Sequence, residues 1–308
     1  MFRRESLRAN GALLMVAFIW GASFPVMKLG LDEASPLLFL TLRFTLAALL
    51  SVPFLPALRG PWARHELLGG ILLGALLAAA FAMQTVGLTH TTPSRSAFLT
   101  SFYVVFVPLL SLPLTGHRPQ RASWLGAFLA LGGLAFMTLN EGLLRWQPGD
   151  LLTLAGALGF ALHILGVGVL TGRHDFRRLY VLQILSATVL LALATPLEEV
   201  FWHPGVHLLW TVILTGGLAT GLTFYIQNRV QRHTSASRTA VIFAMEPVFA
   251  ALITAAMAGG RSDLNRPQIF GALLIMAGLI TSGLGSRAGT SQDEDSAAGP
   301  RRRTASSP

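Results

Sequence analysis

The sequence predicts an all-α integral membrane protein with ten transmembrane helices, arranged as two inverted five-helix repeats. The first observation behind this prediction is composition: 53% of the 308 residues are hydrophobic, 12% are charged, and the mean hydropathy is +0.60. A soluble domain of this composition would expose large apolar patches to water. The second observation is an internal duplication, and the third is the distribution of arginine along the chain.

Ten apolar stretches are each long enough, as a helix, to cross a hydrocarbon core of about 30 Å. The first five cover residues 11–30, 36–55, 67–88, 96–114 and 122–139. The second five cover residues 151–170, 179–196, 208–227, 237–258 and 268–284. Hydroxyl residues around Arg95 and Arg238 begin the fourth and ninth stretches, where they are expected to cap exposed helix amides.

The duplication is clearest where residues 84–110 align with 227–253 at a constant offset of 143, with nine of 27 positions identical. Weaker matches pair the first stretch with the sixth, the second with the seventh and the fifth with the tenth. The repeats are therefore expected at 1–143 and 144–288, followed by a disordered cytoplasmic tail at 289–308.

An odd number of helices per repeat turns the second copy over in the membrane. Arginine distribution tests this independently, because cytoplasmic loops collect basic residues. With the N-terminus inside, 17 of the 23 basic residues fall on the inside segments. Both termini of this multi-pass protein are therefore predicted to be cytoplasmic.

The net charge of +9 is explained by these short basic loops, which contact anionic lipid. No basic and aromatic stripe lies outside the predicted spans, so nucleic acid is not expected as a partner. The chain has no cysteine, and no metal-ligand spacing, phosphate loop or nucleophile motif occurs in it. We therefore expect no catalytic residues, no metal and no cofactor.

Four short motifs resemble the EamA family of the drug/metabolite transporter superfamily. They are Trp20-Gly21-Ala22-Ser23-Phe24 followed by Lys28, then Leu42-Arg43-Phe44, then Thr100 to Phe106, and Met245-Glu246-Pro247-Val248-Phe249. The first repeat departs from the pattern, since Val104 stands where the second has Pro247. The resemblance implies a ten-helix inverted-repeat transporter whose central cavity is lined by helices one, three, four, six, eight and nine. It also implies a location in the bacterial cytoplasmic membrane and export of amino acids or other small metabolites from the cell.

Polar side chains within the spans are the first functional candidates, because they are costly in lipid. Lys28 is the only lysine, and either contacts an anionic substrate group or extends to the outer interface. Arg43 lies deeper and either contacts substrate or forms a structural pair. Glu246 precedes a proline that is expected to kink its helix, beside which the carboxyl group either binds a cation, exchanges a proton or pairs with Arg43 or Lys28.

The other candidates are weaker. His163 either titrates or is satisfied by a neighbouring polar group, and the latter is the common arrangement. Gln84 and Gln227 either contact substrate or bond across helices, with packing favoured. Trp20, Phe24 and Tyr103 are expected in the cavity wall.

These residues predict a secondary transporter that moves a small metabolite by alternating access between the two halves. The alternatives are an intramembrane enzyme acting on lipid-linked substrates, for which no clustered acid–base constellation is found, and a passive channel on the same fold. The expected partners are the small-molecule substrate and the lipid bilayer. A second copy of the chain, in a homodimer, is a further possible partner.

Overall fold

A computed structural model describes residues 2–91, 93–116, 118–138, 147–257 and 265–297 of the chain. Within these ranges, side chains are described except at 2–4, 24–25, 93–94, 254–255, 257 and 284–297.

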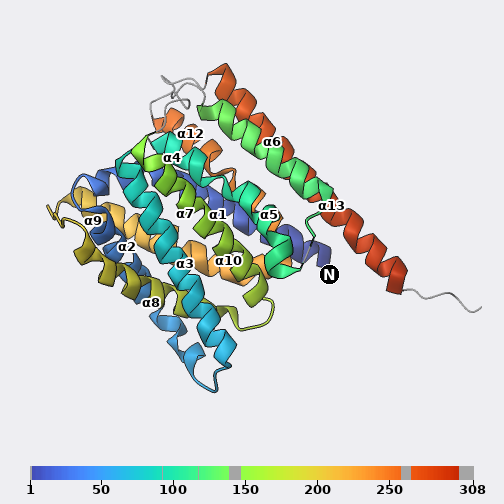
Figure 1. Cartoon of the computed structure of the whole chain (residues 1–308), viewed down its shortest axis with the longest axis horizontal. Coiled ribbons are helices and arrows are strands. Elements are labelled where there is room, and N and C mark those ends of the chain that lie inside the picture. The colour runs from blue at the N-terminus through green and yellow to red at the C-terminus, as the bar shows by residue number, and fades with distance from the viewer. Residues whose placement is uncertain (1, 92, 117, 139–146, 258–264, 298–308) are drawn as a thin grey trace, which may run out of the picture.

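The prediction of an all-helical protein is confirmed for the described residues (Figure 1). The first half contains α1 (Phe2–Leu31), α2 (Pro36–Leu50), η1 (Val52–Leu58), α3 (Arg64–Thr89), α4 (Pro93–Thr100), α5 (Tyr103–Thr115) and α6 (Arg121–Thr138). The second half contains α7 (Pro148–Leu170), α8 (Phe176–Ala194), η3 (Thr195–Leu197), α9 (Val206–Val212), the π-helix η4 (Ile213–Leu222), α10 (Thr223–Val230), η5 (Gln231–His233), α11 (Ala236–Phe243), α12 (Glu246–Met257) and α13 (Arg266–Ala297).

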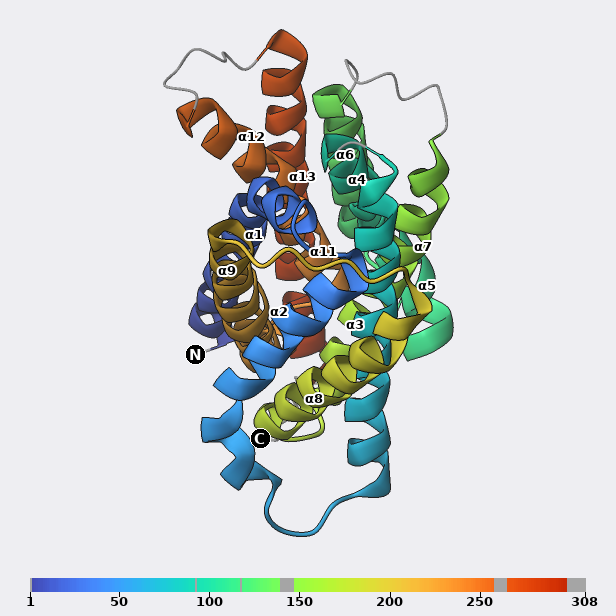
Figure 2. The same ribbon diagram turned by 90° about the vertical axis from the view of Figure 1, so that its left-hand side faces the viewer.

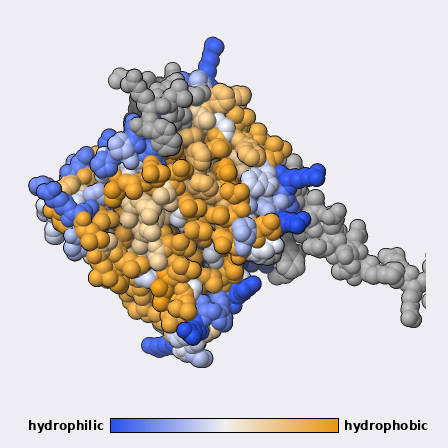
Figure 3. Space-filling view, in the orientation of Figure 1, coloured by the Kyte–Doolittle hydropathy of each residue, from blue (hydrophilic) through white to orange (hydrophobic). Residues whose placement is uncertain are grey.

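The molecule is a multi-pass membrane protein. Within the described residues, seven helical segments are long and apolar enough to cross a bilayer, or eight if α2 and η1 form one bent span. The face in Figure 3 is almost continuously apolar, and its hydrophilic residues gather at the margins. The predicted first and tenth spans fall on α1 and α13, and ten spans remain a prediction.

Two helix ends differ from those predicted. The second span was expected to reach residue 55, but α2 ends at Leu50 and η1 turns away from it by 66°. Pro53 and Pro56 explain the turn, since neither supplies an amide hydrogen to continue an α-helix. At the other end of the chain, α13 runs to Ala297 and so includes part of the segment predicted to be a disordered tail. No proline interrupts the chain between Pro267 and Pro300, while residues 298–308 lie outside the described part.

Two helices are interrupted at matching places in the sequence. The first break, at Ser101 and Phe102, separates α4 from α5, and the second, at Ala244 and Met245, separates α11 from α12. The breaks are 143 positions apart, which is the offset of the sequence repeat. Each break is followed directly by one of the polar residues singled out above, Tyr103 in α5 and Glu246 in α12.

The helices pack around two hydrophobic clusters. The first is built mainly from α1, α5, α6, α7 and α11, and the second mainly from α2, α3, α8 and α10. Figures 1 and 2 show α6 and α13 side by side, while α3 packs against both α7 and α8. Trp20 and Phe160 contact both clusters, so the space beside them lies where the two clusters meet.

Two carboxylates also join separate parts of the chain at one end of the bundle. Glu198 accepts hydrogen bonds from the backbone amides of Leu37 and Leu38, at the start of α2, at 3.0 Å. Glu33 in turn accepts from the amide of Leu208, at the start of α9, at 2.7 Å. Each acidic loop residue therefore satisfies amides at the N-terminus of a helix far away in sequence.

Candidate functional site

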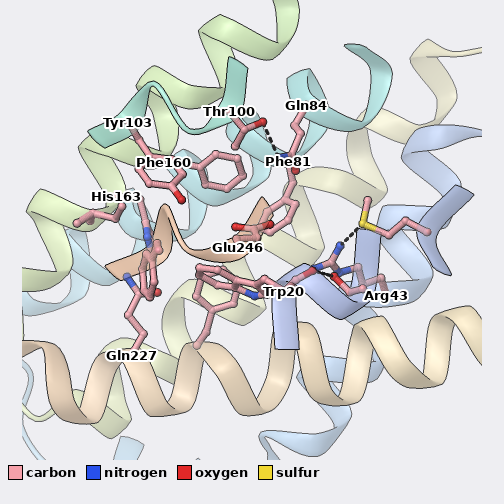
Figure 4. Close-up of a pocket in the computed structure, with 15 residues that line it drawn as sticks. Trp20, Arg43, Phe81, Gln84, Thr100, Tyr103, Phe160, His163, Gln227 and Glu246 are labelled. Carbon is pink, nitrogen blue, oxygen red and sulfur yellow. Dashed lines mark hydrogen bonds between the residues drawn. The ribbon is translucent and has the colours of Figure 1, made fainter. Parts of the chain in front are cut away.

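A cavity lies where the two hydrophobic clusters meet (Figure 4). It encloses about 530 Å³ not occupied by protein atoms, part of it open to the surroundings. The wall is mostly aromatic and aliphatic, with a small number of polar groups. It is formed by Trp20, Ser23, Met27, Arg43, Phe81, Gln84, Thr100, Tyr103, Phe160, His163, Ile164, Phe224, Gln227, Phe243 and Glu246.

Arg43 holds one side of the cavity. It is 2% exposed on α2, where its Nε donates to Thr220 Oγ1 at 2.6 Å and Nη2 donates to the carbonyl of Ala219 at 3.3 Å. The guanidinium also lies over the ring of Phe81, 4.7 Å from its centre, and Nη1 contacts the sulfur of Met27 at 3.5 Å. A thioether is a weak acceptor, so Nη1 keeps hydrogen-bonding capacity toward the cavity.

Trp20 and the π-helix η4 support this side. The indole Nε1 of Trp20 donates to the carbonyl of Ala219 at 2.9 Å, so this one carbonyl accepts from both Trp20 and Arg43. The indole of Trp20 also packs against two phenylalanine rings, with its ring centre 5.7 Å from that of Phe224 and 4.8 Å from that of Phe243. The π-helical turn, a rare feature that is frequent at functional sites, thus positions two residues of the cavity wall.

Glu246 lies between the ends of the cavity in Figure 4. Glu246 is 8% exposed, and among the described residues none donates a hydrogen bond to its carboxyl group. Arg43 is bonded to Thr220 and Ala219 and forms no ion pair with Glu246 among the described contacts. The carboxyl group is therefore available to a positively charged ligand or a proton.

The opposite side of the cavity is polar but uncharged. Figure 4 shows Tyr103, His163 and Gln227 together there, away from Arg43. His163 is 1% exposed and its Nε2 shares a 2.8 Å hydrogen bond with Oε1 of Gln183. Gln227 Nε2 donates to Oε1 of Gln231 at 2.8 Å. His163 is thus held by a neighbouring amide, the common arrangement weighed from the sequence.

The structure brings together seven of the nine residues predicted from the sequence. Lys28 is not among them: it is exposed on α1 and does not line the cavity. Phe24 lies on α1, outside the described side chains. The residues that line the cavity are Trp20, Arg43, Gln84, Tyr103, His163, Gln227 and Glu246. That any of these residues contacts a substrate stays a prediction.

The sequence analysis did not predict the remaining residues of the cavity wall, although the spacing of most of them along the helices could have identified them. All but Ile164, which directly follows His163, lie three or seven positions from a predicted residue, a spacing that places side chains on one face of a continuous helix. Ser23 and Met27 follow Trp20 in this way, and Thr100 and Phe243 lie one turn before Tyr103 and Glu246. The others are Phe81, Phe160, Ile164 and Phe224. Groups of histidine and acidic residues that could hold a metal ion are not found in the described part of the chain.

Known proteins similar to this chain are transporters. The family model described as "EamA-like transporter family" matches residues 7–139 and 147–284. An "Uncharacterized transporter" of Archaeoglobus fulgidus is 32% identical over 281 residues, which are 90% of this chain and 86% of the relative. A "Probable amino-acid metabolite efflux pump" of Salmonella typhimurium is 27% identical over 91% of this chain and 96% of its own length. One protein of known crystal structure shares the fold, with a TM-score of 0.76 and 19% identity over 91% of this chain and 98% of its own.

Proposed function

This chain belongs to the EamA-like transporter family, and on that premise we propose that it is a secondary transporter that exports an amino acid or a related small metabolite. The observation that carries this proposal is the cavity at the meeting of the two hydrophobic clusters, lined by residues of both halves. The similarity to a probable amino-acid metabolite efflux pump supports the substrate class and the direction.

The chemistry of the cavity fits a zwitterion with an apolar body. Nη1 of Arg43 faces a thioether only, and so can donate to a carboxylate. The carboxyl group of Glu246 lacks a donor among the described residues and suits an ammonium group. Trp20, Phe81 and Phe224 supply apolar surface between these groups. Ligand pockets typically combine an apolar wall with a few placed polar groups in this way.

Alternating access between two inverted repeats is the mechanism we propose, with ten spans in total and repeats at 1–143 and 144–288. The matching helix breaks support it, because they recur at the repeat offset of 143 and both deliver a residue to the cavity. Discontinuous helices near the repeat interface are a recurrent way of building transporter sites. Rocking of one half against the other would then expose the cavity to each side in turn.

Proton exchange at Glu246 is the coupling we propose. A buried carboxyl group without a fixed partner can hold either a proton or the ammonium group of the substrate, and binding one excludes the other. Substrate leaving toward a more acidic exterior would then be replaced by a proton. Arg43 does not compete for this position, since Thr220 and Ala219 hold its guanidinium.

Counterflow in proteoliposomes tests the proposed function. Purified protein is reconstituted into vesicles loaded with one unlabelled amino acid at a time, and uptake of the same radiolabelled amino acid is followed. A carrier accumulates label transiently above equilibrium, whereas a channel only equilibrates it. Absence of counterflow across the whole amino-acid panel would refute an amino-acid carrier, and equilibration without overshoot would favour the channel alternative.

A further inference from the structure

Two polar atoms at the uncharged end of the cavity have no hydrogen-bond partner in the described part of the chain. They are the hydroxyl of Tyr103, a residue 3% exposed, and Oε1 of Gln227, a residue 0% exposed. Both residues line the cavity, and Figure 4 places them at the same side of it. Leaving a buried polar group unsatisfied is costly, and for residues that line a cavity a bound group can supply the missing partner.

The orientation of the Gln227 amide follows from a fixed anchor. The backbone carbonyl of Ile164 can only accept, so the amide nitrogen of Gln231 must face it, at 2.6 Å. Oε1 of Gln231 then faces Gln227, whose own amide nitrogen must donate to it, at 2.8 Å. The free atom of Gln227 is therefore an acceptor and requires a donor from the ligand.

The two halves bond the equivalent glutamine amide nitrogens to different partners. Gln84 and Gln227 are equivalent at the offset of 143, and so are Thr100 and Phe243. In the first half, the side-chain amide of Gln84 donates to the hydroxyl of Thr100 at 2.9 Å. Phe243 has no hydroxyl, and the amide nitrogen of Gln227 donates to Gln231 instead. The two halves thus contribute different polar chemistry from equivalent positions.

From this arrangement we infer that Tyr103 and Gln227 form a subsite for an uncharged group that carries both an N–H donor and an oxygen acceptor, a carboxamide in the simplest case. The inference rests on the proposed function and deepens it: the substrate is a zwitterion whose side chain ends in such a group. Its N–H donates to Oε1 of Gln227 while its oxygen accepts from the hydroxyl of Tyr103.

Charged side chains fit this end poorly. A carboxylate would place negative charge against the free oxygen of Gln227, and an ammonium group, which has no acceptor, would leave the O–H of Tyr103 without an acceptor. His163 does not offset either charge freely, because its Nε2 is bonded to Gln183. A carboxamide satisfies both free atoms without bringing an unpaired charge into a buried site.

Asparagine and leucine supply the test, because their side chains have the same number and branching of heavy atoms and differ in hydrogen bonding. Competition of each unlabelled amino acid against counterflow of a labelled transported one gives its apparent affinity. The wild type is expected to bind asparagine about 10-fold to 100-fold more tightly than leucine, since leucine would leave the two buried atoms unsatisfied.

Tyr103→Phe removes one of the two atoms and keeps the ring. It is expected to weaken asparagine binding about 10-fold and to leave leucine binding unchanged. Tyr180→Phe is the matched control, because Tyr180 is also buried, at 2% exposure, but does not line the cavity. Gln227→Met provides a second variant that removes the free acceptor, should Tyr103→Phe fail to fold.

Equal affinities for asparagine and leucine in the wild type would overturn the inference. So would variants in which the affinities for both ligands fall together, since that is the signature of a structural role. In either case, counterflow of leucine or another amino acid would leave the proposed function standing. The proposed function itself fails only if no amino acid of the panel supports counterflow.

Discussion

At the scale of single residues, Arg43 and Glu246 show how charge is carried inside an apolar bundle. Arg43 is held by a hydroxyl, a backbone carbonyl and an aromatic ring rather than by the carboxylate. Glu246 is thereby left without a donor among the described residues. A directly paired arginine and glutamate would have used each other's hydrogen-bonding capacity, whereas these two both keep some of it for a ligand.

Arg43→Lys is expected to weaken binding of an amino acid about 10-fold, because a lysine cannot hold Thr220, Ala219 and a ligand carboxylate with one planar fork. Ligand-induced thermal stabilisation measures this effect. Comparison of an amino acid with its amino alcohol, which lacks the carboxylate, separates contact from fold: the preference for the acid should disappear in the variant. Arg64→Lys, at an exposed position, is the control. A preference that persists in Arg43→Lys would exclude Arg43 as the carboxylate contact.

Glu246→Gln keeps the size of the side chain and removes its ability to exchange a proton. If substrate and proton compete at this carboxyl group, initial rates of transport should depend on pH in the wild type and become independent of pH in the variant. Uptake into proteoliposomes held at a series of symmetric pH values measures the profile. A variant that retains the wild-type profile would show that the proton is carried elsewhere.

At the scale of helices, close contacts between backbones and one buried ion pair hold the bundle. α6 and α13 approach closely where Gly126 faces Gly278 and Gly133 faces Gly271. In lipid, where burial of apolar surface drives little association, such small residues allow helices to pack. α4 and α7 are joined by Arg95 and Asp150, whose side chains are 3% and 1% exposed and lie 2.5 Å apart.

Gly133→Ala is expected to destabilise the protein by about 1–3 kcal/mol, because the added methyl group has no space beside α13. Its Cβ would meet the carbonyl of Gly271 and lie 2.8 Å from Cγ1 of Ile275. Gly132→Ala is the adjacent control, since nothing lies within 4 Å of its Cβ position. Melting temperatures in detergent compare the two variants. Equal melting temperatures would contradict the close packing of α6 against α13.

Asp150→Asn is expected to destabilise the protein by about 3–5 kcal/mol, because the positive charge of Arg95 stays buried without its counter-charge. Asp175→Asn provides the exposed comparison: Asp175 pairs with Arg177 at 2.9 Å, but the two side chains are 32% and 52% exposed. Breaking an exposed pair should cost about 0–1 kcal/mol. Similar losses of melting temperature in both variants would contradict a structural role for the buried pair.

At the scale of the whole molecule, the orientation that we propose for the chain in the membrane rests on arginine distribution and on the proposed inversion of the two repeats. The absence of cysteine makes the native chain a ready background for single-cysteine labelling. A membrane-impermeant maleimide added to intact cells should label Pro204→Cys and leave Arg64→Cys and Arg173→Cys unlabelled until the cells are opened. All three native residues are exposed. Labelling of Arg64→Cys from outside would reverse the proposed orientation.

The sequence singled out residues that share one cavity, but it placed two helix ends incorrectly. Seven of the nine candidate residues line one cavity, because polar side chains within apolar spans are few and tend to face protein interiors. Lys28 is exposed and does not line this cavity, in keeping with the alternative weighed for it, extension of a lysine near a helix end out of the apolar layer. The bend after Leu50 was missed because the apolar run continues through Pro53 and Pro56.

Composition by itself determined that this is an all-helical membrane protein, and four short motifs carried the resemblance to the EamA family that the family match confirms, because hydrophobicity and motifs are properties of the residue order. Only the tertiary structure decided which polar groups remain free. Gln84 and Gln227 are identical in type and equivalent in position, yet the amide nitrogen of Gln84 donates to Thr100, while that of Gln227 donates to Gln231 and its buried oxygen has no partner among the described residues. Hydrogen-bond satisfaction depends on neighbours from other helices, and these are set by packing rather than by position along the chain.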